Sequence, residues 1–360
     1  MTTGALPASR TDEPDTPRRP ELFENTAPGG QPEEKTYTIE TDVQLRGGCS
    51  LDAYRLHQSD ADGQPKLQLT VRYLRRFHPA DLADQFVALA SLLTGRRFEW
   101  TDATNVVGRR TVTERDSARP NPVDPYLGSG TADLGELSDW YKRLLVLTPD
   151  TQWRVLFGAY MYQQAALGIE TRPDTAFLNL VTAIEAVSGT YRLLAAPTLP
   201  DVDCRLAQLV SKVDSPDLRR RLTDAILGRE RFIRRRFVAF VCDHVEHDEL
   251  WPLVAPQDFG GQARRLLPRL VGSIYDERSH ALHDGRPFPM VIRWPHFHTH
   301  SRDYPGAKES AVEFWSRKGV VPPVAFIERL VHHVLRQYLL RVTNREQVPE
   351  SSPGADQGAA

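Results

Sequence analysis

The sequence predicts an α+β protein in which a small mixed α/β domain is followed by an all-α helical bundle. In the first part of the chain, apolar and polar residues alternate over short stretches, which is typical of strands. From residue 136 onward, apolar residues recur every three or four positions, which is typical of amphipathic helices. Of the 360 residues, 40% are hydrophobic and 26% are charged, and the formal net charge is -2. This composition is that of a globular protein with a sizeable core.

The two ends of the chain are predicted to be disordered tails, at residues 1–34 and 346–360. The first tail is rich in Pro, Gly, Thr, Asp and Glu and has few aromatic or β-branched residues, so it buries too little surface to offset the entropy of ordering. The chain has no apolar run long enough for a transmembrane helix, and its first residues lack the apolar segment of a secretory signal. We therefore expect a cytoplasmic protein without a membrane partner.

A mixed strand-and-helix domain is predicted at residues 35–116. Two period-two patterns indicate strands, and they consist of Tyr37, Ile39, Thr41, Val43 and Leu45 and of Leu67, Leu69, Val71 and Tyr73. The period then changes to that of a helix over 81–93, which Gly95 is expected to end, and the strand-like segment RRFEW follows. This order of elements predicts a small sheet with one helix.

A linker rich in Pro and Gly is predicted at 117–135, and a helical domain at 136–345. The expected helices are 136–147, 151–167, 174–188, 203–213, 217–242, 262–283 and 322–342. The third of them carries an apolar stripe from Phe177 to Val187 and is expected to be capped by Asp174, just after Pro173. We expect this helix to be central.

The segment ERSHALHDG, at 277–285, places Arg278 and His283 at R-x4-H spacing near the end of an apolar periodic stretch. The chain has a second pair with this spacing, Arg293 and His298, but Pro295 lies between them and would break a helix that holds both. The first pair is therefore the candidate site. Without further context, the segment also fits an exposed helix end, with His283 near the negative end of the helix dipole and Gly285 in the turn.

The context of this motif is a series of segments in a fixed order: FLNLVTAIEAVSG, RERFIRRRFVAF, YDERSHALHDG and VAFIERLVHHVLRQYLL. Residues 136–343, which contain them, resemble the HEPN superfamily, and the Apea-like branch most of all. The resemblance implies a compact HEPN-like helical domain that is usually dimeric. It also implies a metal-independent ribonuclease of antiphage defence, toxin or stress systems, with an antitoxin or another defence protein as a possible partner.

Arg278 and His283 are suited to cleaving RNA without a metal. The reaction needs a base that activates the ribose 2′-hydroxyl and a cation that stabilises the charge growing on the phosphate. Imidazole titrates near neutral pH, and guanidinium presents a fixed fork of donors. Five residues along a helix turn by about 500°, which leaves the two side chains roughly 140° apart. They meet only if the helix bends, if Arg278 reaches round, or if a two-fold dimer joins two copies.

Three further residues are candidates for assisting roles. Ser279 stands where the family often has a polar amide or an acid, and its hydroxyl is still able to bond a phosphate or ribose. His280 is a candidate second base, although an ordinary surface histidine is the simpler interpretation. Glu185 matches an acidic position of the family's early helix. It is equally well explained as a structural carboxylate, in which case it needs a cationic partner, for which Arg278 is the candidate.

The basic run Arg234, Arg235 and Arg236 is a candidate RNA contact, because arginines that follow one another on a helix can bind phosphates along a backbone. The alternative is a solvated helix face. No metal or cofactor is expected, because nucleotide-binding, dinucleotide-binding and zincin motifs are all missing from the sequence. The alternating histidines His296, His298 and His300 have no carboxylate near them that would complete a metal site.

The function expected from these residues is a metal-independent endoribonuclease that uses 2′-hydroxyl transesterification, with RNA as substrate and a homodimer as the active form. The alternative is a HEPN-like scaffold or RNA-binding protein without catalysis, in which Arg278 and His283 serve packing or ligand contact. The departure from the family pattern at Ser279 supports this alternative.

Overall fold

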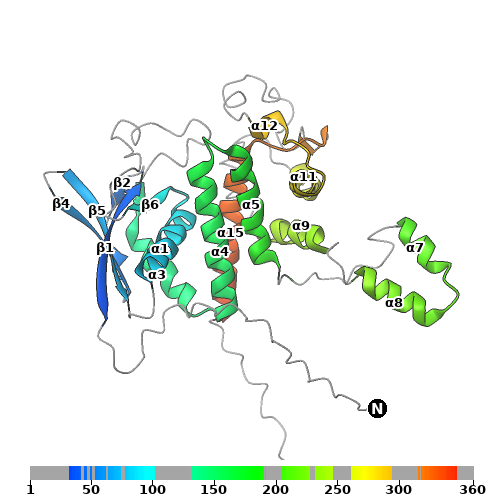
Figure 1. Cartoon of the computed structure of the whole chain (residues 1–360), viewed down its shortest axis with the longest axis horizontal. Helices are drawn as coiled ribbons and strands as arrows, with labels where there is room; N and C mark the ends of the chain where they lie inside the picture. The colour runs from blue at the N-terminus through cyan, green and yellow to red at the C-terminus, as the bar shows by residue number, and fades with distance from the viewer. Residues whose placement is uncertain are drawn as a thin grey trace, which may run out of the picture.

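The computed structural model describes residues 32–41, 44–46, 49–50, 53–61, 64–73, 78–101, 131–189, 191, 204–227, 232–245, 261–293, 315–316 and 318–346. Within them, a small antiparallel sheet near the N-terminus is followed by a mostly helical part. Figure 1 shows the sheet at one end of the molecule and the helices stacked beside it. No helix in this described portion is both long and apolar enough to cross a membrane.

Five strands form the main sheet, in the order β3-β4-β5-β1-β6. Their bounds are β1 Glu33–Thr41, β3 Cys49–Ser50, β4 Tyr54–Ala61, β5 Gln64–Tyr73 and β6 Phe98–Thr101. Two short strands, β2 Gln44–Arg46 and β7 Thr131–Asp133, pair in parallel as a second sheet. The strand expected over 37–45 therefore ends at Thr41, and Leu45 belongs to the other sheet.

One face of the main sheet forms the core of this part of the chain. Tyr37 pairs with Leu69, and Leu69 pairs with Leu56, so that three buried apolar side chains stand in one row across the sheet. The period-two pattern of the sequence predicted the inward side chains of β1 and β5 correctly. It missed β4, whose buried residues Tyr54 and Leu56 lie in a strand with fewer apolar positions.

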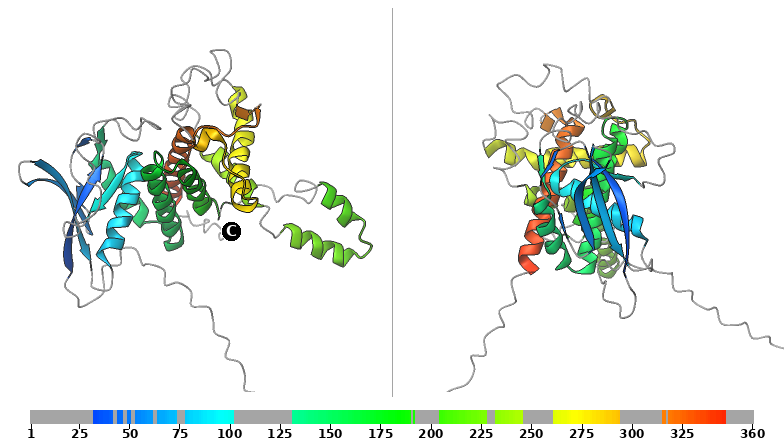
Figure 2. Two further views of the ribbon diagram at one scale, coloured as in Figure 1. Left: turned by 45° about the horizontal axis from the view of Figure 1, so that its top comes forward. Right: turned by 90° about the vertical axis from the view of Figure 1, so that its left-hand side faces the viewer.

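Helix α1 (Pro79–Thr94) covers this face of the sheet, and it confirms the helix expected over 81–93. It ends at Gly95, as the sequence predicted, because the backbone there has φ +64°, a left-handed conformation that glycine adopts most easily. Its other side packs against α4 (Pro149–Gly168), so that α1 lies between the sheet and the helical part, as Figure 2 shows.

The remaining helices lie on both sides of α4: α3 lies toward the sheet, and α7 and α8 project away from the other helices at the opposite end (Figure 1). Their bounds are α3 Leu134–Leu145, α5 Pro173–Ser188, α7 Cys204–Ser211, α8 Pro216–Leu227, α9 Phe232–His244, α11 Gly261–His283, α12 Met290–Arg293 and α15 Val324–Glu346. The single helix expected over 217–242 is wrong, because α8 and α9 are separate helices. Gly228 follows α8 directly, and glycine in a helix interior costs about 1 kcal/mol relative to alanine.

Helix α5 is central, as its apolar stripe predicted. It packs against α4, α9, α11 and α15, and Phe177, Leu180, Ile184 and Val187 are all buried. The helix begins one residue earlier than expected, with Arg172 at the N-cap and Pro173 in its first turn. Proline suits that position because its missing N–H would have no helical partner there. Asp174 instead accepts a hydrogen bond from the backbone N–H of Thr175.

One continuous cluster of buried apolar side chains runs from the sheet through α1 to α4, α5 and α15. The change from strands to helices along the sequence is therefore not accompanied by a break in the core. The tails expected at 1–34 and 346–360 lie almost wholly outside the described residues, although Glu33 and Glu34 belong to β1 and Glu346 ends α15. The expected linker at 117–135 is described only from residue 131, where β7 and the start of α3 occupy it.

Candidate active site at the end of helix α11

Helix α11 presents one apolar face to the core, and Arg278 continues that face. Leu267, Val271 and Ile274 are buried, and each follows the one before by three or four residues. Arg278 comes four residues after Ile274, where the same spacing places its side chain toward α5. Its side chain is 20% exposed, which is low for an arginine. A guanidinium therefore occupies a position at which the helix pattern would otherwise put an apolar side chain.

The partner of Arg278 is Glu185 on α5, as the sequence suggested. Nη2 of Arg278 donates a hydrogen bond of 3.0 Å to Oε2 of Glu185, whose side chain is 16% exposed. Tyr275, one turn before Arg278 on α11, also bonds Glu185. Burial raises the pKa of the Glu185 carboxyl, and the charge of Arg278 and these hydrogen bonds oppose the shift. The pair joins two helices that are far apart in the sequence.

Arg278 keeps hydrogen-bonding capacity beyond this pair. Its Nε is buried, and no described residue accepts a hydrogen bond from it. A buried donor without an acceptor is unfavourable, and such groups are uncommon in folded proteins. A phosphate oxygen is an acceptor that suits a guanidinium, since the planar fork matches the oxygens of a phosphate.

His283 ends α11 and is exposed. The chain turns directly after it, at Gly285, whose φ of +64° is the turn expected from the sequence. The helix is continuous from Arg278 to His283, and no hydrogen bond or ion pair joins these two described residues. A continuous helix keeps their side chains roughly 140° apart. Arg278 accordingly contacts α5, whereas His283 faces solvent.

The assisting candidates Ser279 and His280 are half-buried on the last turns of α11. Glu277, which the sequence analysis did not single out, lies near His280. Partial burial raises the pKa of its carboxyl, and the nearby His280 and Arg286 oppose that shift. Glu277 directly precedes Arg278 in the motif, and its spacing of three residues from His280 was the available sign that the two share a helix face.

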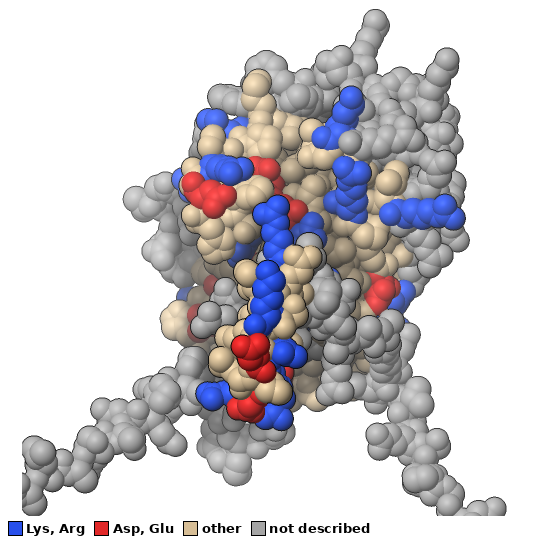
Figure 3. Space-filling model, turned by 90° about the vertical axis from the view of Figure 1, so that its right-hand side faces the viewer, with Lys and Arg blue, Asp and Glu red and all other residues tan. Residues whose placement is uncertain are grey.

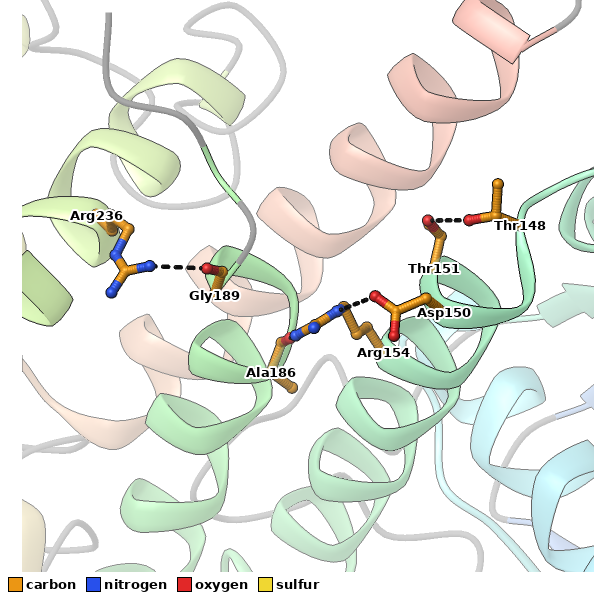
Figure 4. Close-up of polar contacts among 7 residues, drawn as sticks. All are labelled: Thr148, Asp150, Thr151, Arg154, Ala186, Gly189 and Arg236. Atoms are coloured by element: carbon orange, nitrogen blue, oxygen red, sulfur yellow. Dashed lines mark hydrogen bonds and ion pairs between the residues drawn. The ribbon is translucent and has the colours of Figure 1, made fainter. Parts of the chain in front are cut away.

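Two of the three arginines expected to contact RNA are held by other parts of the chain. Arg234 forms a bidentate ion pair with Asp276, at 2.6 and 2.8 Å, and its guanidinium lies over Gly272. Arg236 donates a hydrogen bond of 2.9 Å to the backbone oxygen of Gly189, directly after α5 (Figure 4). Arg235 is half-buried. These contacts fix α9 against α11 and α5.

The end of α5 that carries Glu185 is held from both sides. Arg236 approaches it from α9, and Arg154 approaches from α4, where it donates to Ala186 O at 3.4 Å and pairs with Asp150 at 2.9 Å (Figure 4). Cations near the last carbonyls of a helix are stabilising, because those carbonyls lack helical partners and carry partial negative charge. The position of Glu185, and through it that of Arg278, thus depends on three helices.

No group of three or more His, Cys, Asp or Glu side chains within the described ranges is arranged to hold a metal ion. His296, His298 and His300 lie outside these ranges. Of the second pair with R-x4-H spacing, Arg293 is therefore described and His298 is not. A small apolar cavity between α5, α9, α11 and α15 is lined by core residues such as Ile184 and Ile274. The cavity has room for about one water molecule, which is too small for a substrate.

Comparison of the chain with protein-family models, with curated proteins and with solved structures gives no significant match.

Proposed function

We propose that the chain is a HEPN-like protein of the Apea-like type whose helical part cleaves RNA without a metal, in antiphage defence, as a toxin or in a stress response. The observation that carries the proposal is the pairing of Glu185 with Arg278. It connects two segments on which the resemblance rests, and it holds a partly buried guanidinium five residues before the exposed His283. An ordinary exposed helix end does not require such a pair.

The proposed reaction is transesterification. His283 takes the proton from the ribose 2′-hydroxyl, and the oxygen then attacks the neighbouring phosphorus. The bond from phosphorus to the 5′ oxygen breaks, and that oxygen receives the proton that His283 returns, so the products are a 2′,3′-cyclic phosphate and a 5′-hydroxyl. Arg278 stabilises the additional negative charge on the phosphate oxygens as the attack proceeds. In this proposal Glu185 orients Arg278, and Ser279 and His280 contact the substrate.

The proposed active form is a homodimer. Since Arg278 and His283 face different directions on one straight helix, a single chain brings only one of them to a given phosphate. Two-fold symmetry places two copies of the same surface opposite each other, so that Arg278 of one subunit and His283 of the other can act together. RNA is the substrate, and an antitoxin or another defence protein is the proposed regulatory partner.

The second candidate is a HEPN-like protein that binds RNA or serves as a scaffold without cleaving. The contact of Arg278 with Glu185 favours it, because an arginine held by a carboxylate between two helices also has a purely structural explanation. Ser279, in place of a stronger polar group, favours it as well. The two candidates differ in whether His283 is needed for a chemical step.

The deciding experiment is cleavage of single-stranded RNA by the full chain in the presence of EDTA. The native protein should cleave, and His283→Ala should lower the rate by about 10² to 10⁴, the usual cost of losing a general acid or base. Arg278→Lys should also be impaired, because an ammonium lacks the planar fork. His78→Ala, which removes an exposed histidine before α1, is the matched control and should cleave normally. Full activity of a folded His283→Ala protein would contradict the catalytic proposal.

A further inference from the structure

The face of α11 opposite its apolar side carries basic side chains that are exposed and do not pack in the core. Arg265, Arg269 and His283 share this face, because 4 and 14 residues of helix turn by about 40° and about 320°. Both arginines are exposed, and neither forms an ion pair or a hydrogen bond with another described residue. Along the helix axis they lie about 27 and about 21 Å before His283. Pro268 lies between the two arginines inside the helix, so the ideal geometry holds best for Arg269, which follows the proline.

The middle of this face is covered by α9, because Gly272 is buried there beneath a guanidinium. Arg234 of α9 lies over Gly272 of α11, and an added Cβ at Gly272 would be only 2.5 Å from its Nη2. Asp276, one turn further along α11, takes both donors of that guanidinium. Arg234 therefore reaches the same face as Arg265 and Arg269, with its charge balanced by Asp276.

We propose that single-stranded RNA lies along this outward face of α11, with its phosphates bound by Arg265 and Arg269 and its scissile linkage at His283. The proposal rests on the proposed ribonuclease function and assigns its backbone contacts to residues other than the basic run of α9. Binding of a phosphate by an exposed, unpaired guanidinium is favoured by the release of counterions from the RNA, whereas Arg234 would first have to leave Asp276. Figure 3 views the side on which α7, α8, α9 and α11 lie, where Lys and Arg side chains are spread between acidic ones.

The test measures binding of a fluorescent single-stranded 2′-O-methyl oligonucleotide to the full chain. Its blocked 2′-hydroxyl prevents transesterification, so binding is observed without cleavage. The double variant Arg265→Gln/Arg269→Gln should bind about tenfold more weakly or worse. The slope of log affinity against log salt should fall by about 1.4, because each lost phosphate contact removes about 0.7 for a single strand. The matched control is Arg55→Gln/Arg72→Gln, which removes two exposed arginines from the sheet and should leave both quantities unchanged.

A second variant should change the affinity in the opposite direction. Asp276→Asn removes the charge that balances Arg234, so that the middle of the path gains a cation and the salt slope should rise by about 0.7. An unchanged affinity for Asp276→Asn, or for the α11 double variant, overturns the proposed path. If this happens while native protein still cleaves RNA, the ribonuclease proposal stands and only the path is wrong. If native protein neither binds nor cleaves RNA, both proposals fail together.

Discussion

The carboxylate of Glu185 and the guanidinium of Arg278 meet at 3.0 Å between α5 and α11, and both are mostly buried. Charged side chains such as these are rarely buried in a protein core unless they are paired. Bringing two charges out of water costs several kcal/mol, and their attraction compensates only when the geometry is good. Nε of Arg278 is buried and has no hydrogen-bond acceptor among the described residues. Buried polar groups without a partner are uncommon in folded proteins, which marks this place as a candidate for a bound water, ion or ligand.

Loss of either partner should therefore destabilise the protein. We expect Glu185→Ala to lower the free energy of unfolding by about 2–3 kcal/mol, somewhat less than for a fully buried pair, because Arg278 keeps its charge without a partner. The double variant Glu185→Ala/Arg278→Ala should lose less stability than the sum of the losses of the two single variants, by about 1–3 kcal/mol. Urea unfolding of the four proteins measures this coupling. Additive costs would show that the two side chains do not act as a pair.

Much of the fold could be predicted from the sequence because its elements bury one face. The helices whose apolar stripes face a core, such as α5 and α11, lie within a few residues of their expected bounds. The separation of α8 from α9 was missed because arginines and apolar residues continue on both sides of Gly228 at helical spacing. Strand β4 was missed because its sequence, YRLHQSDA, has too few apolar residues to form a clear alternating pattern.

Within the candidate site, the pairing of Glu185 with Arg278 could be predicted, but the geometry around it could not. The pairing of Glu185 with Arg278 followed from the need of a buried carboxylate for a cation. The ion pair of Arg234 with Asp276 could not be predicted from the sequence. It depends on Gly272, whose lack of a side chain leaves room for the guanidinium of Arg234 from α9. Sequence spacing indicates which side chains share a helix face. It does not indicate which neighbouring helix that face meets.

His332 of α15 should make the stability of the protein depend on pH. Its Nε2 is enclosed without a hydrogen-bond partner among the described residues, its ring stacks on Tyr162, and burial lowers its pKa to about 3. The nearby cations Arg336 and Arg96 and the neighbouring His333 act in the same direction. Between pH 6.5 and 3 the unfolded chain thus binds a proton that the folded chain does not, so stability falls as pH falls through this window.

From pH 7 to pH 5, this histidine should contribute a loss of about 1–2 kcal/mol in the free energy of unfolding. His332→Phe removes the titrating group and should flatten this part of the profile. Urea unfolding at a series of pH values compares the two proteins, and the exposed His78→Phe serves as a control. An identical pH dependence of native and His332→Phe protein would mean that His332 titrates alike in the folded and unfolded chains.

Gly95 and Gly285 should respond differently to the same substitution. Both have φ +64°, so alanine is strained at either position by about 1–2 kcal/mol. A Cβ at Gly95 would also lie 2.8 Å from Cε1 of His332, whereas nothing lies within 4 Å of one at Gly285. Overpacking typically adds about 1–3 kcal/mol. Thermal or urea unfolding should therefore show a larger loss for Gly95→Ala, and equal losses would argue against the close contact with His332.

Catalysis should be restored when two inactive variants are mixed, because the proposed site draws Arg278 from one subunit and His283 from the other. In a heterodimer of Arg278→Lys and His283→Ala subunits, one of the two sites has both native side chains and the other has neither. After random exchange of equal amounts, about a quarter of the native number of sites should be active. RNA cleavage is followed against the mixing ratio, with light scattering for the mass of the particle. A native protein that cleaves as a monomer, together with mixtures that stay inactive, would place Arg278 and His283 of one chain in the same site and require α11 to bend between them.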